Sequence, residues 1–497
     1  MYLGIDCGTQ GTKAVLFDPQ SGQVIGRGHS PHELIANING RREQNAAWWI
    51  AALKVAVAGA IKSSGRGAGE VAAIAVSGQH HGLVMLDGEG QVLRDVKLWN
   101  DTETAEENDR LIADVGGIGQ VWKLINTSLP VGYTASKVRW MSRNEPALYA
   151  RMKHILLPHD YLNYWLTGEM VMDAGEASGT GFFDVATRSW SAEMVKAVDP
   201  SGILAAALPP IAAPHNPIGV VRKEVAEFFG FSPLTLVACG SGDNVMGAVG
   251  TGNVVPGRAT LGLGTSGVLN LHSDIKPQNV DRNIQVFCAV EEGWIPTTCT
   301  MNATSSTSLL QNLFEIPVDD IETLINQASP GAAGIRIFPY FNGERMPPLP
   351  NARATIKGLS YDNFTRPNLM RAMAESVAFG LMWGYERSTR SFGKPSQFRL
   401  TGGGANSQAW RQICADVFDT EVVRVKSDEG GAFGAALLAL AVDLRQKGDN
   451  VTLQEICDQY VELDYDMCEQ PRPEAVAAYR DIYQEFARLR DEEYSND

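Results

Sequence analysis

A short pattern of strand, glycine- and threonine-rich turn and strand occurs twice in this chain, first at the N-terminus and again past the midpoint. The first copy spans residues 3–17 and turns at 8–12, and the second spans 260–271 and turns at 264–267. Apolar runs on either side of a tight glycine turn are typical of β-hairpins. Taken alone, so short a sequence repeat supports a duplicated architecture only weakly.

The segments that follow each hairpin strengthen the case for duplication. Residues 71–76 and 398–400 are strand-like, whereas 48–61 and 369–385 have a helical pattern, so both halves alternate strands with helices. This alternation predicts an α/β fold in which helices cover the sheets. At roughly 150 residues per domain the length would allow about three domains, but the duplication favours two. We expect these domains at 1–245 and 246–445, followed by a C-terminal helical extension at 446–497.

Composition excludes several other classes of protein. The chain is 44% hydrophobic and 20% charged, as folded globular proteins are. Its formal charge of −15 disfavours binding to nucleic acid or to an anionic membrane. The 7 cysteines are odd in number and never spaced as CxxC, which indicates neither a disulfide framework nor a zinc site. Because the first residues also lack a signal-peptide pattern, we expect a cytoplasmic protein.

The first hairpin turn carries groups that could bind a phosphate. Asp6 stands at the end of the first strand, and the turn after it ends in Lys13. Such a turn can point several backbone N–H groups at a phosphate while the carboxylate faces Mg²⁺. The spacing is not that of a Walker A loop. A plain hairpin with an Asx turn is the alternative.

Two further glycine turns have similar chemistry. The second hairpin turn contains Gly264 and Thr265, and residues 402–404 are three successive glycines before Ala405 and Asn406. The glycine run joins a strand to a predicted helix at 408–418, so its N–H groups would lie at a helix N-terminus and could form the wall of a nucleotide site. A flexible loop is the alternative for the run.

The remaining candidate residues follow strands in the N-terminal half. Asp243 lies at a strand-to-helix turn, where a carboxylate could accept a proton from a hydroxyl nucleophile or could be only a helix N-cap. His80 and His81 lie in a polar, glycine-bracketed turn that suits hydrogen bonding to a polyol. Trp99 and Asp101 offer an aromatic face beside an acceptor, although the tryptophan could equally belong to the core.

Together and in this order, these residues resemble the FGGY family of carbohydrate kinases, and within it the members that phosphorylate xylulose. The resemblance runs from Asp6 to about Gly434. It rests on the motifs DCGTQGTK (6–13), GQHHG (78–82), LWND (98–101), LLPHDYLNYWLTGE (156–169), GSGDN (240–244), GLGTSG (262–267), GER (343–345) and TGGGAN (401–406). It implies two actin-like ATPase domains of the ribonuclease H-like type, with an active-site cleft between them, and ATP and Mg²⁺ as cofactors.

The resemblance also implies roles for individual residues. Asp243 matches the catalytic base, and Asp6 matches a catalytic aspartate that holds Mg²⁺ through water. ATP would be bound by Thr9, Gln10, Gly11, Thr12, Lys13, Gly264, Thr265, Gly402, Gly403, Gly404 and Asn406. The sugar would be bound by His80, His81, Trp99, Asp101 and Asn244.

The expected reaction is phosphorylation of D-xylulose to D-xylulose 5-phosphate. Alternative acceptors are ribulose, L-xylulose or a polyol, because the chain has His80 where such kinases commonly have methionine and Glu103 where many relatives have arginine. A non-enzymatic nucleotide switch of actin or chaperone type is the rival from another class, but it has no use for the GQHHG and GSGDN motifs. The expected partners are the sugar and ATP, and relatives of this kind often form homodimers.

Overall fold

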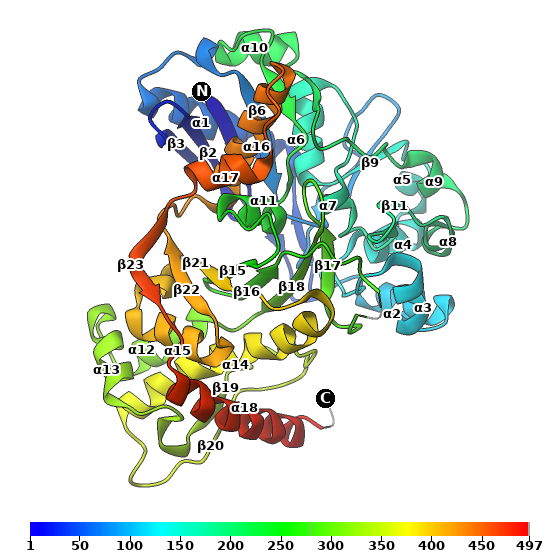
Figure 1. The fold of residues 1–497 in the computed structure, drawn as a ribbon. Helices are drawn as coiled ribbons and strands as arrows, with labels where there is room; N and C mark the ends of the chain where they lie inside the picture. The colour runs from blue at the N-terminus through cyan, green and yellow to red at the C-terminus, as the bar shows by residue number, and fades with distance from the viewer. Residues whose placement is uncertain (279, 496–497) are drawn as a thin grey trace.

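The fold is described from a computed structural model that covers residues 1–278 and 280–495, and it has two lobes, each built around a seven-stranded sheet (Figure 1). In the first sheet the strand order is β12-β13-β6-β1-β2-β3, with β14 also paired to β6. β1, β2 and β3 form an antiparallel meander, whereas β6 and β13 run parallel to β1. The strands are β1 (Tyr2–Cys7), β2 (Gly11–Asp18), β3 (Gln23–Pro31), β6 (Ala73–Gly78), β12 (Pro217–Val220), β13 (Leu236–Ala238) and β14 (Ser241–Gly242).

The second sheet repeats this topology in the order β17-β18-β16-β15-β21-β22-β23. Its β15, β16 and β18 form the antiparallel meander, and β21 and β22 follow in parallel, so the predicted duplication is confirmed. The strands are β15 (Arg258–Leu263), β16 (Gly267–Leu271), β17 (Gln285–Cys288), β18 (Trp294–Thr300), β21 (Gln397–Thr401), β22 (Glu421–Val425) and β23 (Leu463–Glu469). Both predicted hairpins are therefore the first two strands of a sheet.

Helices cover the sheets as the alternating pattern predicts. In the first lobe α1 (Ala46–Ser64) begins at the N-cap Asn45 and packs on β2 and β3. Within the described residues, α1 alone has the length and apolar composition that could span a membrane, and here it contributes to a buried core. In the second lobe α14 (Arg366–Phe392) packs on β16 and β18, while α15 (Gln408–Phe418) packs on β22.

Two helices between the sheets hold the lobes together. α11 (Asp243–Gly250) packs against α16 (Gly430–Gln446), and α16 also packs on β1 and β6 although in sequence it lies between β22 and β23 of the second sheet (Figure 1). The crossing requires glycine: a Cβ on Gly434 would lie 2.0 Å from the Met246 carbonyl oxygen, and one on Gly4 would lie 1.8 Å from that of Ala432. Backbone therefore touches backbone where the lobes join.

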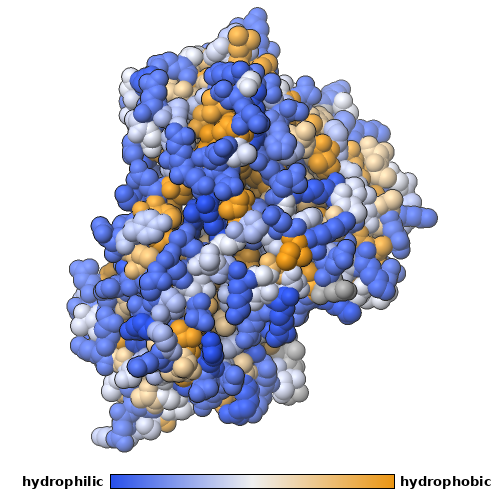
Figure 2. Space-filling view, viewed as in Figure 1, coloured by the Kyte–Doolittle hydropathy of each residue, from blue (hydrophilic) through white to orange (hydrophobic). Residues whose placement is uncertain are grey.

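The rest of the chain adds a helical flank and the C-terminal segment. The flank contains α2 (Ala105–Val115), α3 (Ile118–Ile125), α4 (Thr134–Asn144), α7 (Ala174–Ala177) and α8 (Ala192–Val198). The segment that we predict to be a helical extension contains α17 (Leu453–Tyr460) and α18 (Pro473–Glu493), and it also contributes β23 to the second sheet. On the face shown in Figure 2 hydrophilic residues dominate and apolar residues form separate patches.

Candidate active site

Asp6 lies at the C-terminal end of β1, beside strand residues that pair with it on both sides. Ser77 on β6 and Lys13 on β2 are its register partners. Ser77 Oγ donates a hydrogen bond of 2.7 Å to Asp6 Oδ1. Burial raises the pKa of Asp6, although this hydrogen bond and the charge of Lys13 act in the opposite direction. The site thus holds a carboxylate whose negative charge is costly unless a cation is near.

The first hairpin turn is tied to neighbouring loops. Trp99 Nε1 donates to Thr9 Oγ1 at 2.8 Å, and Thr9 Oγ1 donates to Gln79 Oε1 at 3.1 Å. Gln10 and Lys13 are exposed, and the backbone of Gly11 is half-buried. Thr12 is fully buried, with its hydroxyl 2.9 Å from the Nε2 atom of His32, so its side chain packs inside the lobe. The turn therefore offers backbone groups, Thr9 and Lys13 to a ligand.

The second hairpin, the glycine run and α11 enclose one pocket of about 270 Å³. Its lining includes Asp243, Asn244, Gly264, Gly402 and Gly430. Residues 243–270, the glycine run and the N-terminus of α16 are far apart in the sequence and meet at this one cavity. An added Cβ on Gly402, whose φ is +85°, would lie 2.6 Å from the Leu263 carbonyl oxygen, so only glycine fits this turn.

Four other predicted nucleotide residues belong to the same two turns as Gly264 and Gly402. Thr265 is exposed in the hairpin turn, where its carbonyl oxygen accepts a hydrogen bond from Ala303. Gly403 and Asn406 are exposed and Gly404 is buried, in a short 3₁₀ turn before α15. Thr265 and these three residues are not in the lining of the pocket. Contact with ATP stays a prediction for them, as it does for the lining residues.

Asp243 is the first residue of α11, and Gly242 occupies the N-cap position. Its side chain is 45% exposed in the cleft, while the surrounding protein still removes much of its water. Desolvation, opposed by His80 and helped by Asp6 and Glu176, raises the pKa of Asp243 to about 6. A carboxylate with a pKa near neutrality suits a general base. The N-cap alternative from the sequence is wrong, because Gly242 takes that position.

The two adjacent histidines have different surroundings. His80 is buried, with Nδ1 3.1 Å from Glu176 Oε2 and Nε2 3.4 Å from Asp243 Oδ1. His81 has a φ of 66° and stacks on Tyr133 with 4.2 Å between the ring centres. Its Nδ1 lies 2.8 Å from the carbonyl oxygen of Gly179, which can only accept, so Nδ1 carries the proton. Burial holds the pKa of His81 well below its usual range, and the ring is neutral.

The loop that carries Trp99 also contains Asp101, and the two differ in exposure. Trp99 is half-buried, and the Arg345 guanidinium of the second lobe lies 5.2 Å from the centre of its ring. Asp101 is fully buried, and its two oxygens accept hydrogen bonds from the backbone N–H groups of Arg42 and Glu103. In this structure Asp101 supports the loop, and a direct contact with sugar stays a prediction.

Several residues of this site are brought into it by the fold and not by a recognised sequence signal. Glu176 is fully buried on α7 beside both histidines, and nothing in its local sequence marks it. Arg345 belongs to the quoted GER motif but could not be placed over Trp99 without the fold. Gly430 and Gly431 are the first two residues of the apolar helix α16, and a glycine pair at the start of such a helix is a sequence signal for a phosphate-binding turn.

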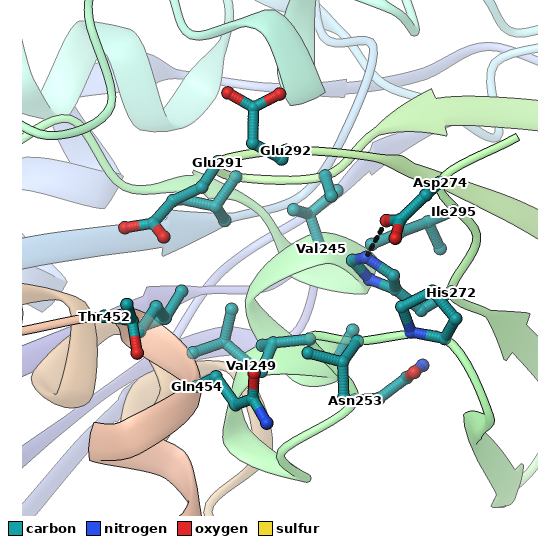
Figure 3. A pocket seen from close by; sticks show the side chains of 17 residues that line it. Val245, Val249, Asn253, His272, Asp274, Glu291, Glu292, Ile295, Thr452 and Gln454 are labelled. Carbon is teal, nitrogen blue, oxygen red and sulfur yellow. Dashed lines mark ion pairs between the residues drawn. The ribbon is translucent and has the colours of Figure 1, made fainter. Parts of the chain in front are cut away.

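A second pocket of about 300 Å³ lies on the other face of α11 (Figure 3). Val245, Ala248 and Val249 of α11 line it, and the labelled residues in Figure 3 include Thr452 and Gln454 at the start of α17. None of the predicted site residues lines this pocket. The helix thus presents Asp243 and Asn244 to one cavity and its apolar face to another.

Comparison with known proteins agrees with this geometry. The N-terminal domain model of the FGGY family of carbohydrate kinases matches residues 1–250, and the C-terminal domain model matches 260–442. Xylulose kinase of Haemophilus influenzae is 45% identical over 490 residues, covering 98% of each chain. Xylulose kinase of Escherichia coli is 33% identical over 503 residues, also covering 98% of each.

Among solved structures, a xyloylose kinase from Brucella ovis superposes with a TM-score of 0.91 at 29% identity and covers 100% of both chains. The predicted fold class is confirmed by this likeness, whereas the division at residue 245 stays a prediction. From its sequence, its two matched domains and its fold, the chain belongs to the FGGY family of carbohydrate kinases.

Proposed function

We propose that this chain transfers the γ-phosphoryl group of ATP to the 5-hydroxyl of D-xylulose, forming D-xylulose 5-phosphate and ADP. The observation that carries the proposal is the position of Asp243. This one carboxylate lines the predicted nucleotide pocket and also lies 3.4 Å from His80 in the predicted sugar motif. The names of the relatives in Haemophilus influenzae and Escherichia coli support xylulose as the acceptor.

In this reaction Asp243 acts as the general base. Its carboxylate takes the proton of the sugar hydroxyl while the hydroxyl oxygen bonds to the γ-phosphorus, and the bond from that phosphorus to the β-phosphate oxygen breaks to release ADP. Phosphoryl transfer of this kind depends on positioning and charge stabilisation more than on covalent chemistry. With a pKa of about 6, Asp243 is ready to accept the proton at neutral pH.

Asp6 fits the magnesium ion that such kinases use. Its oxygen atoms are the hard ligands that Mg²⁺ prefers. Only Oδ1 is engaged by Ser77, and among the described residues Oδ2 has no hydrogen-bond donor. Burial makes its charge costly, which a cation would offset. Asp6 would hold the ion through water, and the ion would supply positive charge to the β- and γ-phosphate oxygens.

The chain's own groups would bind the rest of ATP. Lys13 and the N–H groups of both hairpin turns would face the phosphates, and the Gly402 turn would lie along the adenosine. The whole protein carries a formal charge of −15, so no broad basic surface would attract ATP. These local donors would therefore have to neutralise the charge of its phosphates. We also propose a cytoplasmic location for this activity.

Replacement of the base tests the proposed mechanism. Asp243→Asn should keep ATP binding but lower kcat by about 10²- to 10⁴-fold, the usual contribution of a general base. Steady-state ADP release with D-xylulose measures kcat, and titration calorimetry measures nucleotide binding. Asp274→Asn is the control, because this aspartate lines the second pocket and should leave kcat unchanged. Near-normal turnover in Asp243→Asn would contradict the assignment.

A panel of acceptors tests the sugar. ADP release should have its highest kcat/KM with D-xylulose, compared with ribulose, L-xylulose and polyols. A higher kcat/KM with another member of the panel would support the kinase activity but contradict D-xylulose as the preferred substrate. ATP-dependent filament formation or peptide binding without sugar-stimulated ADP release would favour the nucleotide switch instead.

A further inference from the structure

A buried chain of acidic and imidazole groups leads away from Asp243 into the first lobe. His80 joins Asp243 to Glu176, whose Oε2 atom also lies 3.6 Å from the Nδ1 atom of His159. The Nε2 atom of His159 in turn lies 3.3 Å from Asp173 Oδ1. The ring nitrogens of His80 and His159 lie within ion-pair distance of these carboxylates but form no well-shaped hydrogen bond with them, so the attraction is chiefly between charges.

The backbone is shaped to admit the His80 ring at this position. A Cβ on Gly242 would lie 1.9 Å from His80 Cε1 and 2.4 Å from Glu176 Oε2, so the residue before Asp243 has to be glycine. The ring also packs against Phe287 of β17, at 4.9 Å between ring centres. His80 is 4% exposed, so it has little room to turn away from Asp243.

We propose that His80, held between Glu176 and Asp243, is a positioning residue that keeps the Asp243 carboxylate ionised and fixed in orientation for proton transfer. The proposal rests on the proposed function of Asp243 as the base. The GQHHG motif predicts His80 as a sugar contact, whereas in the structure its ring nitrogens face two carboxylates. The Oδ1 atom of Asp243 is engaged by His80, which leaves Oδ2 for the substrate hydroxyl.

The charges around His80 keep it cationic. Burial lowers its pKa, but Glu176, followed by Asp243 and Asp173, outweighs burial and raises the pKa of His80 to about 9. A cation at 3.4 Å stabilises the ionised form of Asp243. His80 is therefore charged throughout the range in which Asp243 titrates.

Other groups that face Asp243 act in the opposite direction or remain neutral. Asp6 of β1 and Glu176 of α7 both raise the pKa of Asp243. Cys299 of β18 also interacts with Asp243, and burial raises the pKa of this thiol, so it carries no charge near neutral pH. Among the groups that act on Asp243, His80 is the cation.

The test is the pH dependence of kcat/KM for D-xylulose, measured between about pH 5 and pH 9. In the wild type, activity should rise as Asp243 loses its proton near pH 6. His80→Gln and His80→Met remove the positive charge, so the acid limb should move upward by about one pH unit or more. Activity should approach that of the wild type at the alkaline end.

Two further variants separate charge from structure. His80→Lys restores a cation and should return the acid limb toward that of the wild type. His154→Gln on β9 (His154–Leu156) makes the same exchange outside the cleft and should leave the limb in place. Thermal unfolding of each protein identifies a variant that fails to fold. If His80→Gln or His80→Met fails to fold, the pH profile of the other one is used for the test.

The outcomes are distinguishable. An acid limb that stays in place in both neutral variants, or that moves equally in His80→Lys, overturns the positioning role. A raised KM for the sugar at every pH with an unmoved limb would assign His80 to sugar binding instead. If the wild type shows no sugar-dependent ADP release, the proposed function itself fails, whatever the variants do.

Discussion

At the residue scale, a buried lysine fixes the other histidine of the sugar motif. Lys137 of α4 is fully buried, and its Nζ atom donates a hydrogen bond of 2.7 Å to the carbonyl oxygen of His81 and another to that of Gly132. Burial lowers the pKa of Lys137 to about 7. His81 needs this support because its φ of 66° is uncommon for a residue with a side chain.

Lys137→Met should therefore weaken sugar binding more than nucleotide binding. The variant leaves the buried Gly132 carbonyl oxygen without its side-chain donor and the His81 carbonyl oxygen with only the Thr134 hydroxyl at 3.2 Å. Loss of a donor to a buried carbonyl costs about 1–3 kcal/mol, and we expect KM for D-xylulose to rise roughly tenfold. KM for ATP should change little, because Lys137 contacts the loop of His81 and not the nucleotide pocket. The exposed Lys223→Met is the control. Equal changes in both KM values would contradict this role.

Residue type alone gave Asp6, Asp243 and the two histidines as candidates, because carboxylates and imidazoles after strands are common at active sites. It could not give Glu176, which lies in a short helix and reaches His80 only through the folded chain. It also could not show that Thr12 and Asp101 are buried, since burial depends on what packs over them.

At the element scale, the crossing of α11 and α16 sets the position of the base. Asp243 begins α11, and the N-terminus of α16 reaches the same pocket through Gly430. An added side chain at the crossing would have to displace backbone, because the Cβ of residue 434 would lie 2.0 Å from the Met246 carbonyl oxygen. The two helices would then separate.

Gly434→Val should lower the free energy of unfolding by about 1–3 kcal/mol or more, as overpacking does. Chemical denaturation measures this change. Gly247→Ala in α11 is the matched control, because its Cβ would meet no atom within 4 Å and alanine favours helix by about 1 kcal/mol. Equal stability of the wild type and Gly434→Val would mean that the crossing is looser than described.

The hairpins and several helices were predictable because periodicity and glycine turns are local signals. The predicted helix at 408–418 coincides with α15, and the strand at 398–400 lies within β21. The return of α16 to the first sheet was not predictable, since an apolar helix carries no signal of which sheet it will cover. The same holds for β23, which completes the second sheet from the C-terminal segment.

At the scale of the whole molecule, Arg345 joins the two lobes by its contact with Trp99 at 5.2 Å. Such a pair is worth about 0.5–1 kcal/mol at an exposed site. It lies beside Thr9 of the phosphate turn, to which the Trp99 indole donates its hydrogen bond. Closure of the lobes on the sugar would exclude water from the γ-phosphate.

Arg345→Ala should therefore raise ADP release without sugar, relative to release with D-xylulose, by roughly two- to fivefold. Release with and without the sugar measures this ratio. Arg387→Ala is the matched control, because Arg387 lies over Trp383 within the single helix α14, at 3.9 Å. An unchanged ratio in Arg345→Ala would show that this contact does not help to close the cleft.

The central claim is that this FGGY kinase uses Asp243 to phosphorylate D-xylulose, and identification of the product tests it most directly. Wild-type protein, ATP, Mg²⁺ and D-xylulose are incubated, and the product is analysed by phosphorus NMR. We predict D-xylulose 5-phosphate with ADP in equal amounts, and almost none with Asp243→Asn. Absence of the phosphorylated sugar with the wild type, or its normal formation by the variant, would contradict the account.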